Sequence, residues 1–262
     1  MPTIKTEHEL KCLRRLSFCY LCGKPFGTDS TKDRDHVPPR SLFAKTDRCQ
    51  PLLLPTHPAC NQANSMDDEQ IAQLVAVLHG KHPSPENLRL RFSAHRMPGS
   101  PTPAAAVHGI NLTTIVFRWL RAFHAALYHE FLPSCGGYIH PPFPEGNSPY
   151  DLKPIVPIQA EYVKAIKKNR LSKTTDSIIC WNHKCRYECV WAKDDHGLKN
   201  LCIFALDLYG WEELGDIHHH PARSCTGIYT PPSVPAAASW DTKLYFPFEN
   251  MHPLSAFDAE ST

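Results

Sequence analysis

The stretch CYLCGKPFGTDSTKDRDHVPPRSLF, residues 19–43, decides how the N-terminal part of this chain is interpreted. It opens with a Cys-x-x-Cys pair, a spacing typical of a metal site on a tight turn. It then runs through a short polar segment into Asp35-His36, which two prolines follow. A metal-binding Cys-x-x-Cys clip does not require an Asp-His pair, and an Asp-His pair does not require a metal clip. The interpretation therefore depends on whether further metal ligands, and further residues that could act with Asp35-His36, follow later in the chain.

The other half of the clip is in HPACN, residues 57–61. The complete Cys₃His set, sufficient for a closed tetrahedral zinc site, is Cys19, Cys22, His57 and Cys60. Four protein ligands leave no open coordination position, so such a zinc is structural and holds two distant segments together. Chance spacing is the alternative, because the chain contains eleven cysteines.

The residues around the second half of the clip suggest chemistry beside the zinc. Pro58 suits the first turn of a helix, and Asn61 directly follows the last cysteine. We expect a β-hairpin between the two halves of the clip, with Asp35 and His36 on one strand. If the zinc joins strand and helix, Asp35 and Asn61 meet, and His36 lies beside them. Their oxygens suit Mg²⁺ or Mn²⁺, and His36 could deprotonate the water that attacks a phosphodiester.

Each of these residues also has a plainer interpretation. Asp35-His36 could form a turn before the rigid Pro-Pro, and Asn61 could merely cap the helix or the zinc turn. Asp33 is a rival of Asp35, because it lies two residues away on the same strand face. Arg40 could bind a phosphate or be a solvated surface arginine.

The combined pattern C-x-x-C, D-H-V-P-P-R and H-x-x-C-N resembles the HNH nucleases, also called the ββα-metal or His-Me finger fold, in their zinc-stapled form. It is similar to phage recombination endonuclease VII, and the resemblance covers residues 19 to about 70. It implies that Asp35 and Asn61 bind the catalytic Mg²⁺ or Mn²⁺ and that His36 is the general base. It also implies a structural zinc and hydrolysis of DNA to 5′-phosphate and 3′-hydroxyl ends.

The chain departs from that family pattern at two places. His57 stands where the family usually has cysteine, which zinc chemistry tolerates. No asparagine lies between His36 and His57, although the family pattern has one there. We therefore expect a backbone carbonyl, or Asn64 one helical turn beyond Asn61, to orient the base.

Hydrophobic periodicity outside this stretch predicts an α+β fold. An apolar stripe and a capping box formed by Ser65 and Asp68 predict a helix over 66–80. A stronger stripe predicts a helix over 111–132, with Asn111 as its cap and Pro133 as its stop. The remaining expected elements are a short basic helix over 158–169 and a small antiparallel sheet within 177–208, with KDDHGLK as a hairpin turn.

Proline clusters suggest how the chain is divided. We expect a zinc-stapled HNH nuclease domain at 12–82, a Pro-rich linker at 83–104, and an α+β domain of unknown role at 105–262. A homo-oligomer or a regulatory partner could form through that C-terminal half. Arginines and a histidine of the 111–132 helix could face nucleic acid, although a solvated or inter-domain face is the commoner explanation.

The bulk properties fit a protein of the cytoplasm. The formal net charge is +2, and residues 1–50 hold ten Lys or Arg against six Asp or Glu. The sequence contains neither an export signal nor a membrane-length apolar run, so reduced thiols and metal ligands are expected. CWNHKCRYEC suggests a second metal site, but buried sheet cysteines are the commoner explanation. The main alternative to a nuclease is a non-catalytic zinc module that binds nucleic acid or protein, and an RNase on the same scaffold is a third possibility that the sequence does not separate from a DNase.

Overall fold

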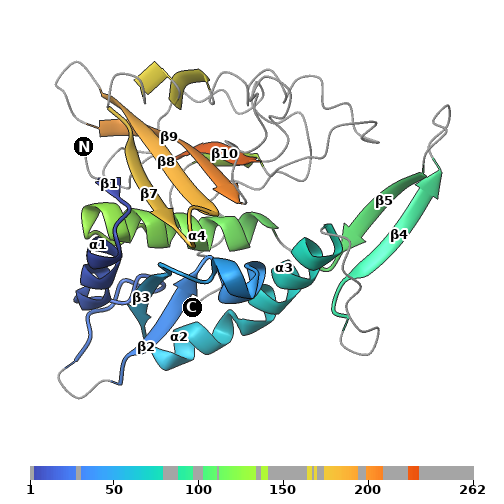
Figure 1. The fold of residues 1–262 in the computed structure, drawn as a ribbon, viewed down its shortest axis with the longest axis horizontal. Helices are drawn as coiled ribbons and strands as arrows, with labels where there is room; N and C mark the ends of the chain where they lie inside the picture. The colour runs from blue at the N-terminus through green and yellow to red at the C-terminus, as the bar shows by residue number, and fades with distance from the viewer. Residues whose placement is uncertain are drawn as a thin grey trace.

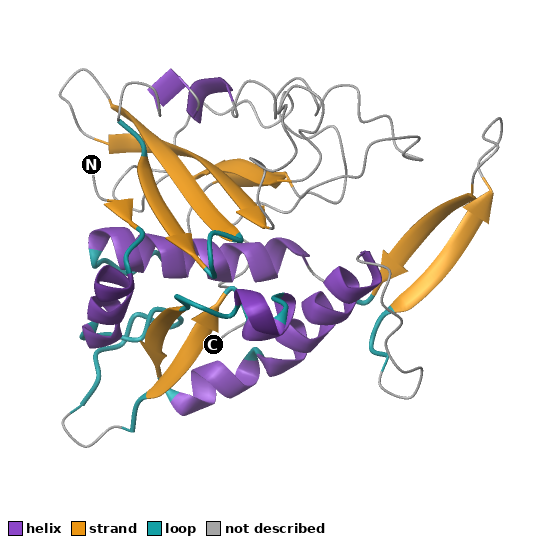
Figure 2. Ribbon diagram, in the orientation of Figure 1, coloured by secondary structure: helices purple, strands orange, loops and turns teal. Residues whose placement is uncertain are grey.

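A computed structural model describes most of the first two-thirds of the chain and part of the remainder. The described residues are 3–27, 31–78, 88–96, 103–110, 112–133, 137–140, 164–166, 168–169, 174–193, 199–208 and 224–229. Within them the chain is a mixture of helices and mainly antiparallel strands, so the predicted α+β class is confirmed. Figure 2 shows a long helix between a sheet on one side and shorter helices and strands on the other.

The N-terminal part contains two antiparallel strands followed at once by a helix. β2 (Asp33–Val37) pairs with β3 (Leu52–Thr56), and α2 (Pro58–Ala63) begins two residues later. Proline at the first helical position of α2 fits there because that position needs no backbone donor. The side chains of β3 are all buried, as its run of leucines requires. The β-hairpin expected between the two halves of the clip is therefore present, with Asp35 and His36 on β2, and its connection holds the 3₁₀ turns η2 (Arg40–Leu42) and η3 (Lys45–Asp47).

The helix α3 (Ser65–Leu78) follows α2 with only Asn64 between them. This agrees with the predicted helix over 66–80, but the predicted capping box does not form. Ser65 is the first helical residue, and its hydroxyl donates to the carbonyl of Gln62. A capping box is present elsewhere, at the start of α1 (Glu7–Cys12), where Thr6 and Glu9 cap each other. The 3₁₀ turn η1 (Leu13–Arg15) continues from α1.

A six-stranded sheet forms the other side of the molecule. Its strand order is β1-β7-β8-β9-β10-β6, and every pair is antiparallel except the parallel pair β1–β7. The strands are β1 (Thr3–Ile4), β6 (Gly137–His140), β7 (Asp176–Cys180), β8 (Cys185–Lys193), β9 (Lys199–Leu208) and β10 (Ser224–Tyr229). The small antiparallel sheet predicted within 177–208 is therefore confirmed, and the first strand of the chain extends it. Most of the KDDHGLK turn lies outside the described residues.

The helix α4 (Leu112–Tyr128) lies between this sheet and the β2–β3–α2 unit (Figure 1). It ends before the predicted Pro133 because His129 adopts a left-handed conformation, with φ of 56°. Its predicted cap, Asn111, lies outside the described residues. A single cluster of buried side chains runs from Leu10 to Tyr229 and includes residues of β3, α4 and the sheet. The cluster therefore contains residues of both the predicted 12–82 and 105–262 segments.

The Pro-rich stretch contains regular structure. β4 (Arg91–Arg96) and β5 (Pro103–His108) form a separate antiparallel ribbon, which extends away from the rest of the fold in Figure 1. Pro103 occupies the first position of its strand, where a missing backbone donor is tolerated. Of the basic helix predicted at 158–169, only residues 164–166 and 168–169 are described, and they are helical.

Candidate metal centre and adjoining pocket

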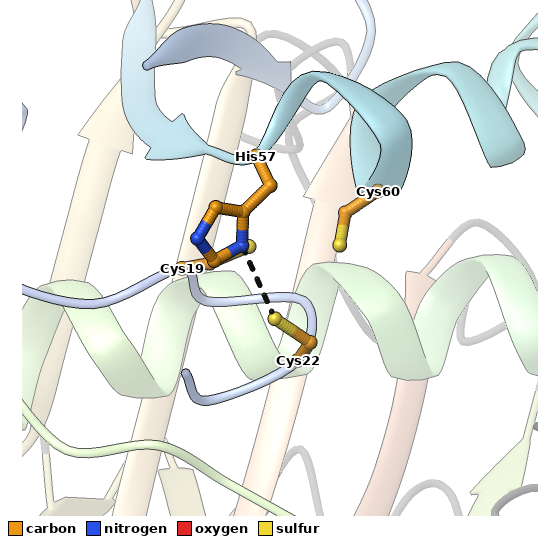
Figure 3. Close-up of side chains that lie close together, drawn as sticks. All are labelled: Cys19, Cys22, His57 and Cys60. Carbon is orange, nitrogen blue, oxygen red and sulfur yellow. Dashed lines mark hydrogen bonds between the residues drawn. The ribbon is translucent and has the colours of Figure 1, made fainter. Parts of the chain in front are cut away.

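The two halves of the Cys-His clip meet in space. The ligand atoms of Cys19, Cys22, His57 and Cys60 all lie within 4.8 Å of one another, and Figure 3 shows the four side chains converging. Sγ of Cys22 is 3.4 Å from Nδ1 of His57. A tetrahedral zinc with Zn–S bonds of about 2.3 Å would hold its ligand atoms about 3.8 Å apart. The cluster is therefore compatible with a structural zinc.

Local backbone structure presents each pair of ligands. The N–H of Cys19 donates to the carbonyl of Lys24 over 2.9 Å, and the N–H of Gly23 donates to the carbonyl of Cys19 over 2.8 Å. Gly23 has φ of +73°, and a Cβ there would lie 2.6 Å from the ring of Phe131, so only glycine fits. His57 occupies the N-cap position of α2, and Cys60 lies in the first turn of that helix.

The protonation chemistry of the cluster also fits a metal. Burial, followed by the neighbouring thiols, raises the pKa of Cys60 to about 12. Burial likewise raises the pKa of Cys19. Thiols held this close resist ionisation because each new thiolate would repel the next. A divalent cation removes that repulsion and binds the thiolates directly, so the donor set suits zinc rather than an unmetallated thiol cluster.

A pocket of about 560 Å³ is lined by residues of β2, α2 and α3, among them Pro58 and Asn61, the chain neighbours of the ligands His57 and Cys60. All four of the other predicted site residues, His36, Asp35, Asn61 and Arg40, line this pocket. The complete lining comprises Asp33, Arg34, Asp35, His36, Pro39, Arg40, Ser41, Pro58, Asn61, Gln62, Ser65 and Asp68. The strand β2, the 3₁₀ turn η2 and the helices α2 and α3 therefore present acids, an imidazole, two amides and two arginines to one space.

The two aspartates of β2 have different surroundings. Nδ2 of Asn61 donates to Oδ2 of Asp33 over 2.7 Å, and this hydrogen bond lowers the pKa of the exposed Asp33. Asp35 is only 6% exposed and accepts a hydrogen bond from the Tyr20 hydroxyl. Burial raises the pKa of Asp35, against the opposing effect of that hydrogen bond. The structure thus brings Asn61 onto Asp33, and Asp35 lies deeper in the same pocket.

Arg118 of α4 bonds to Asp68, one of the residues that line the pocket. Its guanidinium donates to Oδ1 of Asp68 and, over 3.3 Å, to the carbonyl of Asn64. Arg118 is 6% exposed, so it lies in the interior and not on a nucleic-acid-facing surface. Burial raises the pKa of Asp68 to about 6, although Arg118 opposes that shift. Little in the sequence indicated that Arg118 and Asp68 pair, because an acidic residue in the first turn of a helix is common and has its own explanation.

His36 is half-buried, and burial lowers its pKa, which favours the neutral ring near neutral pH. Its imidazole lies against the indole of Trp181, with ring centroids 5.7 Å apart. The amide of Asn64, the expected alternative for orienting the base, donates instead to the carbonyl of Cys60 over 2.7 Å. Sequence analysis missed Trp181, because its segment CWNHKCRYEC was considered only as metal ligands or sheet cysteines.

The cysteines of that segment are part of the sheet core. Cys180, Cys185 and Cys189 are fully buried, as the alternation of strand residues indicated. Among the residues that the structure describes, the zinc cluster is the one group of His, Cys, Asp or Glu with metal-site spacing. The triple histidine at 218–220 lies outside the described residues.

Two further findings bear on function. None of the helices in the described part of the chain has the length and apolarity needed to cross a membrane. Comparisons of this chain with protein-family models, curated proteins and solved structures gave no match. Functional inference must therefore rest on the residues of the site itself.

Proposed function

We propose that this chain is a metal-dependent endonuclease of the HNH type, which hydrolyses phosphodiester bonds in DNA. The observation that carries the proposal is the single pocket lined by His36, Asp33, Asp35 and Asn61, next to a Cys₃His cluster compatible with zinc. The order of strand, strand and helix around the cluster also supports it. This is the arrangement that the resemblance to zinc-stapled HNH nucleases leads one to expect.

Each pocket residue has a role in the proposed reaction. His36 takes a proton from the attacking water, whose oxygen then bonds to phosphorus as the bond to the 3′ oxygen breaks. The carboxylates and the Asn61 amide oxygen are the donors that would hold a divalent ion, with Asp35 and Asn61 as the inferred ligands and Asp33 as the alternative carboxylate. Bound there, Mg²⁺ or Mn²⁺ would stabilise negative charge on the phosphate. Arg34 and Arg40 are exposed at the pocket and suit contacts with neighbouring phosphates.

The deciding experiment is nicking of supercoiled plasmid in Mg²⁺ or Mn²⁺ by the wild-type chain and by His36→Ala. Loss of a general base typically lowers the rate by about 10²- to 10⁴-fold. We expect that loss with unchanged zinc content and unchanged DNA affinity. His8→Ala, which alters an exposed histidine of α1, is the matched control and should cut like wild type. If His36→Ala also cuts like wild type, the non-catalytic zinc module replaces this proposal.

The same assay separates the base from the inferred metal ligands. Asp35→Ala and Asn61→Ala should weaken Mn²⁺ binding, and their residual nicking should rise as Mn²⁺ is added. Residual nicking by His36→Ala should not respond to Mn²⁺. Asp33→Ala decides which carboxylate of β2 binds the ion, because Asn61 is bonded to Asp33 in the structure.

A further inference from the structure

The turn between β7 and β8 has an unusual backbone. Trp181, Asn182 and His183 have φ of 55°, 53° and 64°, so three consecutive non-glycine residues are left-handed. The N–H of Lys184 donates to the carbonyl of Trp181 over 2.9 Å and closes the turn. L-residues disfavour this conformation, and it persists only where surrounding contacts impose it. The contacts made by this turn therefore indicate what it is for.

Those contacts are with the segment between β2 and β3. The N–H of Trp181 donates to the carbonyl of Gln50 over 2.9 Å, and the N–H of Asn182 donates to the carbonyl of Cys49 over 3.1 Å. Gln50 is itself left-handed, with φ of 50°. The turn between β7 and β8 is thus joined by two main-chain hydrogen bonds to the segment that connects β2 and β3.

The Trp181 side chain continues this contact to the strand that carries His36. Its indole is fully buried and stacks on Phe43, with ring centroids 4.7 Å apart and an interplanar angle of 13°. Its Nε1–H donates to the carbonyl of Val37 over 3.2 Å, and its ring lies against the His36 imidazole. Trp181 therefore bonds to the residue next to His36, and its ring contacts the His36 imidazole.

We propose that Trp181 is a positioning residue that holds the His36 imidazole in place from beneath the pocket. This role rests on the proposed nuclease function and gives the C-terminal sheet a part in it. The indole fixes the ring by contact and fixes the strand by its hydrogen bond to Val37. The strained turn between β7 and β8 holds the Trp181 indole against Phe43 and His36.

Two variants of Trp181 test the proposal. Trp181→Phe keeps an aromatic ring on Phe43 but loses the donor to Val37, whereas Trp181→Leu loses both. Small misplacement of a catalytic group costs up to about 10²-fold. We expect kcat for plasmid nicking to fall about tenfold in Trp181→Phe and about 10²-fold in Trp181→Leu, with KM and zinc content unchanged.

Trp191→Phe is the matched control. It also removes an indole donor from the same sheet, because Nε1 of Trp191 donates to the Tyr128 hydroxyl over 2.7 Å. The Trp191 ring packs against Tyr128 and Tyr229, whereas the Trp181 ring packs against Phe43 and His36. A general destabilisation of the sheet should lower kcat to a similar extent in Trp181→Phe and Trp191→Phe. Both variants should be compared at equal folded fraction. The positioning role is overturned if Trp181→Phe and Trp191→Phe have the same kcat.

Ring signals of ¹³C-labelled histidine give a readout that does not depend on cleavage. The His36 signal, assigned by its absence in His36→Gln, should be single and narrow in wild type and broadened or split in Trp181→Leu. A single narrow signal in Trp181→Leu would overturn the positioning role. If wild type itself does not nick DNA, the proposed function fails, and the ring signal still decides whether Trp181 holds His36.

Discussion

At the scale of single residues, burial gives different chemistry to side chains that stand close together in the sequence. Asp33 is exposed and bonded to Asn61, so its ionised form is favoured. Asp35, two positions along the same strand, is enclosed with Tyr20, and burial disfavours its charge. A cation in the pocket would stabilise the ionised form of both carboxylates, and the stabilisation would be larger for the buried Asp35 than for the exposed Asp33.

The same reasoning predicts how zinc affinity depends on pH. Cys19 and Cys60 have pKa values raised above the ordinary range, so both carry protons at pH 7–8. Zinc must displace those protons, and its apparent affinity should therefore rise at least about 10²-fold per pH unit over that range. Competition with a chromophoric chelator at several pH values measures the slope. Cys12→Ser changes an exposed cysteine outside the cluster and should leave this pH dependence unchanged. An affinity that rises tenfold or less per pH unit, which corresponds to one displaced proton or fewer, would contradict the assignment of Cys19 and Cys60 as zinc ligands.

At the scale of elements, helix α4 supports the pocket through one ion pair, between the buried Arg118 and the partly buried Asp68. Arg118 of α4 bonds to Asp68 in the first part of α3 and to the carbonyl of Asn64, where α2 gives way to α3. Both Asp68 and Asn61 line the pocket from these short helices. The orientation of α2 and α3 relative to the core thus depends on a guanidinium that comes from much later in the chain.

Arg118→Met should therefore destabilise the fold strongly. Removing one partner of a buried pair leaves an uncompensated charge and typically costs about 3–5 kcal/mol. Urea unfolding should register that loss, and Arg118→Met combined with Asp68→Leu should recover part of it, because no charge then stays buried. Lys11→Met, which breaks the exposed pair with Glu7, is the control and should change stability little. A double variant no more stable than Arg118→Met would contradict this account.

At the scale of the whole molecule, the β2–β3–α2 unit depends on contacts from beyond residue 110. Trp181 of the sheet covers Phe43, Arg118 of α4 pairs with Asp68, and Phe131 packs on Gly23 of the zinc turn. Phe43 is 2% exposed within this shared core. A zinc held by the Cys₃His cluster would fix one end of this region, and side chains from the later half of the chain pack against the rest.

A fragment ending at residue 110 should accordingly fail to fold as a stable unit, even with zinc. Burial of one large apolar side chain contributes about 2 kcal/mol, and several lose their cover in the fragment. Domains of this kind are stable by only about 5–15 kcal/mol in total. Amide ¹H–¹⁵N spectra of the fragment should be poorly dispersed, and those of the full chain should be well dispersed. A well-dispersed, zinc-binding fragment would show instead that the N-terminal part of the chain folds autonomously.

The sequence by itself determined what depends on local spacing. The ligand set Cys19, Cys22, His57 and Cys60 was readable because each pair lies within one turn, and one metal needs only four donors. The helix α4 and the strands within 177–208 were readable because their apolar residues repeat with the period of one element. Asn61 was found because it directly follows the ligand Cys60, and Asp35, His36 and Arg40 were found because they stand together in the stretch DHVPPR between the two ligand pairs.

Only the tertiary structure decided which side chains meet across long separations. The hydrogen bond of Asn61 to Asp33 and the enclosure of Asp35 by Tyr20 depend on how α2 packs on β2, which alternation along the strand does not specify. Local sequence did not reveal Trp181 as the neighbour of His36, because 145 positions separate them (181 − 36). Spacing along a chain determines contacts within a turn or a strand, whereas contacts between elements depend on how all buried surfaces fit at once.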